Sequence, residues 1–424
     1  MKKLVLLPGV LTLAACAPTT VHPVKEVPMV QAVAETAKVG KPADSDDPAI
    51  WVDSTDATRS FVIATRKEGG LTSFDLAGKT IQDYNPGKIR YNNVDLVRGF
   101  KLGGKLVDLA VASERLSDRV AAFVIDPQTR QFREVTSPNS PMIFTPAGEQ
   151  SDGKRKSYGL TAYRTASGQD RVLVTQNGFP TIAEVELFDD GQGVSVRPIN
   201  RYVFPAAQAG LTVDDPQFEG MVVDAATGYA FLGQEQVGVW RLKLGTQQVN
   251  LLDRVAPAGE RLSADVEGLT IVRGQGNAGY LLVSSQGSNR YSVYDRLGEK
   301  YFGSFQISLG NDLVTDSDGA DVVTSNLGGR FSQGLLVVQD GDAGGRRMSP
   351  ISNWCPGETS IRPLNCPRSG DPFGVLATFA RKHSSRKFCC LGRGSPNSQT
   401  LLANSKTAVR RGGSSRLGNE KCGI

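Results

Sequence analysis

Short runs of alternating apolar and polar residues repeat along most of this chain, and each group of runs begins with a motif of acidic or amide side chains. The groups begin near residues 46, 92, 158, 217, 265 and 318, at spacings of 46, 66, 59, 48 and 53 residues. Gly, Asp, Asn and Pro separate the runs, and helical periodicity is scarce between 40 and 342. This pattern restricts the chain to an all-β fold.

The length of the repeat favours one all-β architecture. Each group has room for about four short strands, and six such sheets predict a six-bladed β-propeller. A tandem of β-sandwiches is the alternative, but it gives no reason for an acid-bearing motif at the head of every group. In a propeller the innermost strands line one central channel, so acids at equivalent positions converge there.

The first of these motifs places two adjacent carboxylates directly before a proline and an apolar strand, in Ser45-Asp46-Asp47-Pro48-Ala49-Ile50-Trp51. A buried, unpaired carboxylate is costly, although an Asp-Asp pair can also be a solvated turn. Ca²⁺ prefers oxygen ligands, so the recurrence of such motifs predicts calcium binding. The other four are Asn92-Asn93-Val94-Asp95, Gln217-Phe218-Glu219-Gly220, Asp265-Val266-Glu267-Gly268 and Asp316-Ser317-Asp318-Gly319-Ala320-Asp321.

Charge and composition exclude several classes of function. Residues 344–424 contain 14 Lys and Arg against 3 Asp and Glu, and the remainder contains 34 basic and 40 acidic residues. The net charge of +5 therefore comes from the tail, and no nucleic-acid partner is expected. Both histidines, His22 and His383, lie outside the predicted propeller, which disfavours Ser-His-Asp hydrolysis and zinc-histidine sites. Residues 17–354 contain no cysteine, so we expect neither disulfides nor thiol catalysis there.

The N-terminus predicts export. Met1-Lys2-Lys3 precedes a short apolar stretch, and Leu13-Ala14-Ala15-Cys16 resembles a bacterial lipobox. We therefore expect a lipoprotein signal peptide over 1–15, lipidation of Cys16 and a Pro- and Thr-bearing tether over 16–35. An ordinary signal peptide with an incidental cysteine is the alternative. The expected location is the bacterial cell envelope, in the periplasm or at the outer membrane, with the membrane contacted through the lipid anchor.

Several motifs, in order along the chain, together resemble the signature of the β-propeller phytases. They are the stretch from Asp44 to Trp51, Asn92-Asn93-Val94-Asp95, Asp265-Val266-Glu267-Gly268-Leu269-Thr270, Ser284-Ser285-Gln286-Gly287-Ser288, Thr315-Asp316-Ser317-Asp318-Gly319 and Val338-Gln339-Asp340-Gly341. The resemblance covers roughly residues 35–342 and indicates a propeller domain over 36–342. It implies a calcium-dependent, 3-phytase-like phosphomonoesterase. Such a monomeric enzyme would hydrolyse phytate (myo-inositol hexakisphosphate) or calcium-phytate by attack of metal-activated water.

The resemblance also implies roles for individual residues. Glu219 and Asp312 would be catalytic, and the calcium ligands around the cleaved phosphate would be Glu219, Glu235, Asp265, Glu267, Gln286 and Asp312. A second, structural calcium would be bound by Asp47 and the carbonyl groups of Pro48 and Val94. The substrate phosphates would contact Lys67, Arg115 and Tyr158. The chain departs from the family pattern at Gln176-Asn177, where a phosphate-binding lysine is common.

Each of these residues also has an ordinary structural alternative. Lys67 could be a hairpin charge, Arg115 could pair with Glu114, and Tyr158 could be a half-buried ring. Glu219 could belong to a solvated turn. For Asp316 and Asp318, a turn cap and a role in Ca²⁺ binding both stay open.

The electrostatics agree with a calcium-dependent enzyme. An acidic domain would repel a polyanion such as phytate, whereas several bound Ca²⁺ ions would reverse the sign of the channel mouth. Two other functions stay open at this stage. One is a non-enzymatic surface propeller, and the other is a calcium-dependent lactonase-type propeller hydrolase, which usually needs a histidine.

The residues after Gly341 differ from the rest. Residues 343–424 are basic, contain five cysteines without a zinc-like spacing and lack periodicity. They predict a disordered or frameshifted tail and a sixth unit without its outer strand.

Overall fold

A computed structural model describes residues 27–37, 44–151, 156–205, 216–341 and, for the backbone alone, 347–352. All of them belong to the first of two units in the chain, Met1–Ser385. They form β-strands and three short 3₁₀ helices, η1 (Ala57–Arg59), η2 (Gln286–Ser288) and η3 (Gly329–Phe331), which confirms the all-β prediction. None of the helices in these ranges has the length and apolar character needed to span a membrane.

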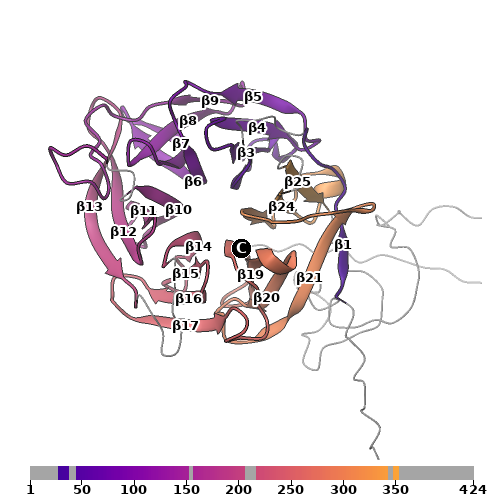
Figure 1. Cartoon of the computed structure of the whole chain (residues 1–424). Helices are drawn as coiled ribbons and strands as arrows, with labels where there is room; N and C mark the ends of the chain where they lie inside the picture. Colours follow the sequence, from indigo (N-terminus) through magenta and orange to yellow (C-terminus); the bar gives the residue numbers. More distant parts are fainter. Residues whose placement is uncertain (1–26, 38–43, 152–155, 206–215, 342–346, 353–424) are drawn as a thin grey trace, which may run out of the picture. The chain divides into compact units, whose positions relative to one another are not determined.

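Four of the sheets are four-stranded antiparallel meanders (Figure 1). The first contains β2 (Pro48–Trp51), β3 (Phe61–Thr65), β4 (Leu71–Asp75) and β5 (Thr80–Tyr84). The second contains β6 (Tyr91–Leu102), β7 (Lys105–Glu114), β8 (Arg119–Asp126) and β9 (Gln131–Glu134). The third contains β10 (Ser157–Arg164), β11 (Asp170–Gln176), β12 (Thr181–Asp189) and β13 (Val194–Val203). The fourth contains β14 (Phe218–Asp224), β15 (Tyr229–Gln234), β16 (Gly238–Lys243) and β17 (Val249–Arg254).

The fifth sheet includes the first described strand of the chain. Its meander is β18 (Val266–Arg273), β19 (Gly279–Ser285), β20 (Arg290–Asp295) and β21 (Tyr301–Leu309), and β22 (Asp312–Leu313) pairs with β21. On the outer side, β1 (Met29–Gln31) pairs in parallel with β21. The predicted tether over 16–35 therefore extended too far, because β1 satisfies the free hydrogen-bonding edge of β21 and Ala32 is buried beside it.

The sixth sheet has three described strands, β23 (Ala320–Val323), β24 (Leu335–Asp340) and β25 (Arg347–Ser352). The propeller architecture is confirmed, but complete sheets of four or more strands number five, one fewer than the six blades predicted. The prediction of an unstructured tail from 343 was wrong for β25, which pairs with β24 as an edge strand and so accommodates Pro350. Residues 353–424 and Cys16 lie outside the described residues.

The innermost strands of the sheets surround a central channel. β2, β6, β10, β14, β18 and β23 each contact the next in order, and β23 contacts β2 (Figure 1). Apolar side chains fill the space between neighbouring sheets. One cluster, for example, combines Val111 and Val120 of the second sheet with Val172 and Val185 of the third. Both faces of the inner strands are therefore buried, as in β3, in which all five residues are buried.

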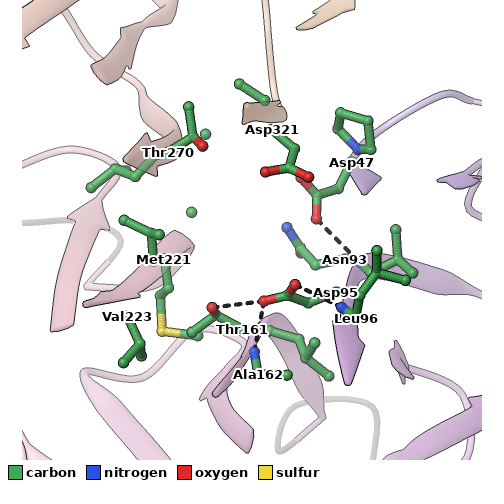
Figure 2. Close-up of a pocket in the computed structure, with 18 of the residues that line it drawn as sticks. Asp47, Asn93, Asp95, Leu96, Thr161, Ala162, Met221, Val223, Thr270 and Asp321 are labelled. Atoms are coloured by element: carbon green, nitrogen blue, oxygen red, sulfur yellow. Dashed lines mark hydrogen bonds between the residues drawn. The ribbon is translucent and has the colours of Figure 1, made fainter. Parts of the chain in front are cut away.

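Carboxylates at the channel wall connect neighbouring innermost strands (Figure 2). Asp47 Oδ2 accepts a hydrogen bond from the backbone N–H of Val94 at 3.1 Å, and Asp95 Oδ2 accepts one from Ala162 at 2.7 Å. Asp321 Oδ2 accepts one from Ile50 at 2.8 Å, which joins the last sheet to the first. Three acids of the sequence motifs therefore connect adjacent sheets.

We predict that a chain beginning at residue 44 is less stable than one beginning at residue 27. The shorter chain lacks the β1 pairing and the 2.8 Å hydrogen bond from Gln31 Nε2 to Ser308 Oγ. A loss of about 2 kcal/mol should lower Tm by about 3 °C in a domain of roughly 300 residues. Thermal denaturation of the two chains tests this, with Gln31→Ala as the smaller change. Equal Tm values would show that β1 contributes nothing.

Candidate active site

Glycines that follow acidic residues bring neighbouring innermost strands unusually close. A Cβ atom added at Gly220 would lie 2.1 Å from the carbonyl oxygen of Glu267, and one at Gly268 would lie 2.8 Å from that of Asp318. Only glycine allows backbones to approach this closely. Gly159 follows Tyr158 rather than an acid, but it allows the same close approach, with 2.0 Å from its added Cβ to the Glu219 carbonyl oxygen. The acid-glycine pairs of the sequence thus place one acidic residue directly beside the next.

Three glutamates meet at this end of the channel. Glu219 is the second residue of β14, Glu267 is the second residue of β18, and Glu235 directly follows β15. Each offers a carboxylate oxygen within 4.8 Å of the others. All three are buried. Burial, followed by repulsion from Glu219 and Glu235, raises the pKa of Glu267 well above its ordinary value. We call these three residues the glutamate cluster.

The glutamate cluster fits a hard divalent cation. Glu267 Oε2 is buried and has no hydrogen-bond partner among the described residues. An oxygen of this kind is costly unless it is paired, and carboxylate oxygens are the ligands that Ca²⁺ prefers. Without a cation, three buried carboxylates held together carry two costs, the loss of hydration and their mutual repulsion.

Two further predicted ligands lie near the cluster. Asp265 directly precedes β18, and its charge contributes to the raised pKa of Glu267. Gln286 follows β19, and its Nε2 donates a hydrogen bond to Asp318 Oδ1 at 2.6 Å. The structure therefore brings five of the six predicted ligands of the first site to the same end of the channel.

Asp312 is the exception, because its position does not agree with the predicted role as a calcium ligand of the first site. It is exposed on β22 and pairs with Leu309 of β21, an outer strand of the fifth sheet. No innermost strand carries it, so the structure does not bring it to the glutamate cluster. The acid-glycine pattern identifies Asp318 instead, because Asp318-Gly319 occupies the place that Glu219-Gly220 and Glu267-Gly268 occupy in their sheets.

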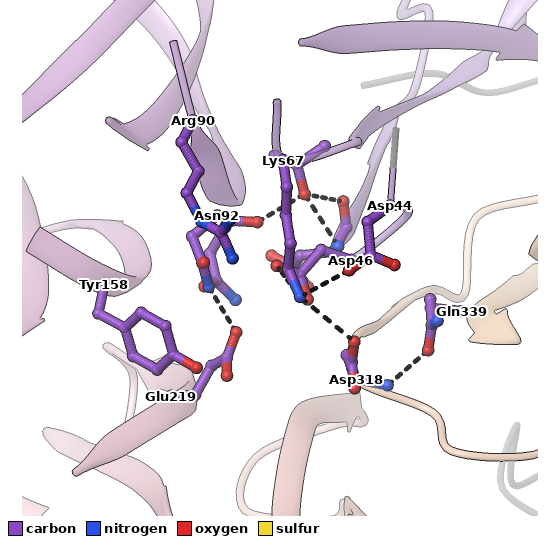
Figure 3. A network of polar contacts seen from close by, with 12 residues as sticks. Asp44, Asp46, Lys67, Arg90, Asn92, Tyr158, Glu219, Asp318 and Gln339 are labelled. Atoms are coloured by element: carbon purple, nitrogen blue, oxygen red, sulfur yellow. Dashed lines mark hydrogen bonds and ion pairs between the residues drawn. The ribbon is translucent and has the colours of Figure 1, made fainter. Parts of the chain in front are cut away.

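Lys67 lies among aspartates from the first and last sheets (Figure 3). Its Nζ is 3.3 Å from Asp44, 3.6 Å from Asp46 and 3.9 Å from Asp318. The side chain is largely buried, with 13% of its surface exposed. Lys67 is therefore part of the acidic channel mouth, and the alternative of a solvent-facing hairpin charge does not hold.

Arg115 and Tyr158 lie against the glutamate cluster. Asn92 Nδ2 donates to Glu219 Oε1 at 2.5 Å, and Arg115 Nη1 donates to Asn92 Oδ1 at 2.8 Å. The Arg115 guanidinium lies 4.4 Å from the ring centroid of Tyr158. Burial and the charges of Glu219 and Glu235 raise the pKa of Tyr158 well above its usual value. Tyr158 therefore stays protonated and can donate a hydrogen bond, while Arg115 supplies a fixed positive charge.

A second acidic group lines a cavity of about 240 Å³ deeper in the channel (Figure 2). The predicted structural site, Asp47 with Pro48 and Val94, lies in its wall beside Asp95 and Asp321. Burial raises the pKa of Asp47 well above its usual value and raises that of Asp321 to about 6. The guanidinium of Arg273 in the same wall partly offsets the effect on Asp321.

The fold and the carboxylate geometry agree with what comparison of sequences finds. The sequence profile of the family described as Phytase matches residues 2–347. This chain belongs to the phytase family. A 3-phytase from Bacillus subtilis (strain 168) is 33% identical over 326 residues, which are 74% of this chain and 79% of that protein.

The fold can also be compared with solved structures. An auxiliary nutrient binding protein from Bacteroides thetaiotaomicron is 9% identical, with a TM-score of 0.43 over 73% of this chain and 70% of that one. A similarity this low carries no weight for the function of this phytase.

The family resemblance assigned no individual role to several residues of the phytase site. Asp46, Asn92 and Asp318 belong to quoted motifs, and the structure places them in the polar network of Figure 3. For Asp318, the signal was the glycine that follows it. Gln217, beside Glu235, had no comparable signal in the sequence.

We predict that Gly220→Ala separates β14 from β18. The new methyl group would overlap the Glu267 carbonyl, so the free energy of unfolding should fall by about 1–3 kcal/mol, and calcium affinity should fall with it. Urea denaturation and calcium titration measure the two effects. Gly245→Ala is the control, because Gly245 has open space and its φ of +73° adds only local strain. A Gly220→Ala protein with unchanged calcium affinity would contradict the role of this contact.

We predict that the calcium-free protein loses stability as pH rises from 5 to 8. The folded-state pKa of Asp321 is about 6, above its value of about 3.9 in an unfolded chain, so its favourable contribution is complete below pH 4 and lost as pH passes 6. Asp47, Asp95 and Glu267 shift in the same direction. Asp321→Asn should reduce the loss by up to about 1.4 kcal/mol, as measured by urea denaturation between pH 5 and 8, because about one unit of its pKa shift lies above pH 5. Stability that rises with pH in wild type would contradict this electrostatic account.

Proposed function

We propose that this chain is a calcium-dependent phosphomonoesterase that releases phosphate from phytate. Membership in the phytase family makes it a phosphoric monoester hydrolase of phytate. The dependence on calcium rests on one observation: three buried glutamates meet within 4.8 Å, beside Lys67 and Arg115. Carboxylates alone would repel the substrate, whereas carboxylates with bound cations would attract it.

The residues at the mouth divide into cation ligands and phosphate contacts. Glu219, Glu235 and Glu267 would hold calcium, together with Asp265, Gln286 and Asp318. Bound calcium would supply positive charge to the phosphate oxygens and lower the pKa of an attacking water.

Three side chains of this mouth would contact the substrate phosphates directly. Lys67 and Arg115 would neutralise phosphate oxygens, and Arg115 is held in place by Asn92 and the Tyr158 ring. The protonated Tyr158 would donate a hydrogen bond.

A second calcium would have a structural role deeper in the channel. Asp47 and the carbonyl groups of Pro48 and Val94 would bind it, in the cavity that these residues share with Asp95 and Asp321. The raised pKa of Asp47 supports this assignment, because a bound cation would relieve the cost of the buried charge.

The remaining proposals concern assembly and location. The three-stranded sheet would serve as the sixth blade, because β23 contacts both β18 and β2. The signal peptide and lipobox support export and anchoring through Cys16 in the cell envelope, with the domain acting as a monomer on phytate or calcium-phytate. The non-enzymatic and lactonase alternatives are disfavoured, because the family match and the basic residues beside the cluster both support phosphate chemistry.

Phosphate release from phytate tests the proposal. We expect chelation to abolish release and added calcium to restore it, with much less activity on a simple aryl phosphate. Glu219→Gln should reduce turnover by at least about 100-fold at saturating substrate, because it removes a cluster carboxylate.

Asp312→Asn is the matched control for that experiment. It also removes one carboxylate, but from exposed β22, and should retain nearly full turnover. Activity that persists in chelator would refute the calcium mechanism. A large loss in Asp312→Asn would refute the present placement of the site.

A further inference from the structure

Glu235 depends on another residue for its orientation. It lies in the turn after β15 rather than in a strand, so pairing within the sheet does not fix its side chain. It is also 7% exposed and close to two other carboxylates. A carboxylate in this position would turn away from its neighbours unless a donor held it.

Gln217 supplies that donor. Its Nε2 lies 2.8 Å from both Oε1 and Oε2 of Glu235. The backbone N–H of Glu235 also donates to the Gln217 carbonyl oxygen at 3.3 Å. Gln217 directly precedes β14 and is 9% exposed, so the amide and the carboxylate meet in a nearly dry environment, where such hydrogen bonds are strong.

The neighbouring sheet fixes which end of the Gln217 amide faces Glu235. Gln217 Oε1 accepts hydrogen bonds from Asn177 Nδ2 at 2.9 Å and from the backbone N–H of Gly178 at 3.2 Å. Both donors lie in the loop after β11 in the third sheet. Because donors occupy the oxygen end, the nitrogen end must point to Glu235.

An amide side chain suits position 217 better than a positively charged side chain would. Lys or Arg at position 217 would also hold Glu235, but its positive charge would cancel one negative charge of the glutamate cluster. An amide orients the carboxylate and leaves its full charge for a bound cation. Hydrogen bonds of this kind to ligating carboxylates are a general means of tuning metal affinity.

We propose that Gln217 is a positioning residue that orients Glu235 for cation binding, and that Asn177 acts on the cluster only through Gln217. This inference rests on the proposed function, in which Glu235 is a calcium ligand. It predicts that a loop residue of the third sheet, with no contact to the glutamate cluster itself, controls calcium affinity.

Calcium titration of the full-length, metal-free protein by calorimetry tests the proposal, with Ca²⁺ alone as the probe. Glu219→Gln identifies the binding phase that belongs to the glutamate cluster. Gln217→Leu keeps the side chain's size but removes its hydrogen bonds, and should weaken that phase by about 10- to 100-fold. Asn177→Ala should weaken it by a smaller factor. The double variant should bind calcium no more weakly than Gln217→Leu alone, because the two residues act in series.

Gln82→Leu is the matched control. The Gln82 amide also connects two sheets, through hydrogen bonds of 2.9 and 2.8 Å to Phe132, but far from the glutamate cluster in the fold. It should leave calcium affinity unchanged. Thermal denaturation in chelator establishes that each variant is folded. If Gln217→Leu does not fold, the calcium affinity of Asn177→Ala alone decides whether Gln217 has the positioning role.

The outcomes separate this inference from the proposed function. If wild type shows no calcium phase that depends on Glu219, the proposed function fails. If wild type shows this phase but folded Gln217→Leu, or folded Asn177→Ala in its place, binds calcium as wild type does, the positioning role is overturned. Additive effects in the double variant would overturn the series arrangement.

Discussion

The site depends on the close approach of neighbouring backbones at the beginning of the innermost strands. Glycine at positions 159, 220 and 268 removes the side chain that would keep two sheets apart. The residue that precedes each glycine, Tyr158, Glu219 or Glu267, is then carried toward the acidic motif of the next sheet. Side-chain flexibility alone could not bring Glu219 and Glu267 together, because the distance between their strands sets the distance between their carboxylates.

This arrangement holds several carboxylates in buried positions where their negative charge is unfavourable. The carboxylates of Glu267, Asp47 and Asp321 all have raised pKa values, and burial is the first cause for each. Asp321 and Asp95 offset part of the cost by accepting backbone hydrogen bonds from a neighbouring sheet. The glutamate cluster has fewer such donors, and Glu267 Oε2 has none among the described residues. Asp47 also accepts a backbone hydrogen bond from a neighbouring sheet, yet its pKa stays well above the ordinary value, so a bound cation would lower the cost in both acidic groups.

Much of the fold could be predicted from the sequence, because local patterns determine it. The innermost strands begin within two residues of the predicted starts, since each start is marked by a polar motif followed by an apolar run. The edges of the fold could not be predicted in this way. β1 and β25 have little pattern of their own and form because β21 and β24 offer unpaired edges, which depends on tertiary structure.

The candidate site shows the same division. Glu219, Glu267 and Asp47 are found from their motifs because an adjacent glycine or proline marks them. Asp312 was misplaced because it is near such a motif in sequence but lies on an outer strand. Gln217 belongs to one of the quoted motifs and Asn177 to the departure from the family pattern, but neither motif predicts the hydrogen bond that joins them across two sheets.

The hydrogen bond from Ile50 to Asp321 also has a consequence for biosynthesis. Its partners are separated by 271 residues, and β1 pairs with a strand at a similar separation. The ring can close only after the ribosome has made nearly the whole domain. Until then the first sheet has an exposed flank, and contacts of such long range form slowly. Newly made chains therefore need protection from aggregation until the last sheet is complete.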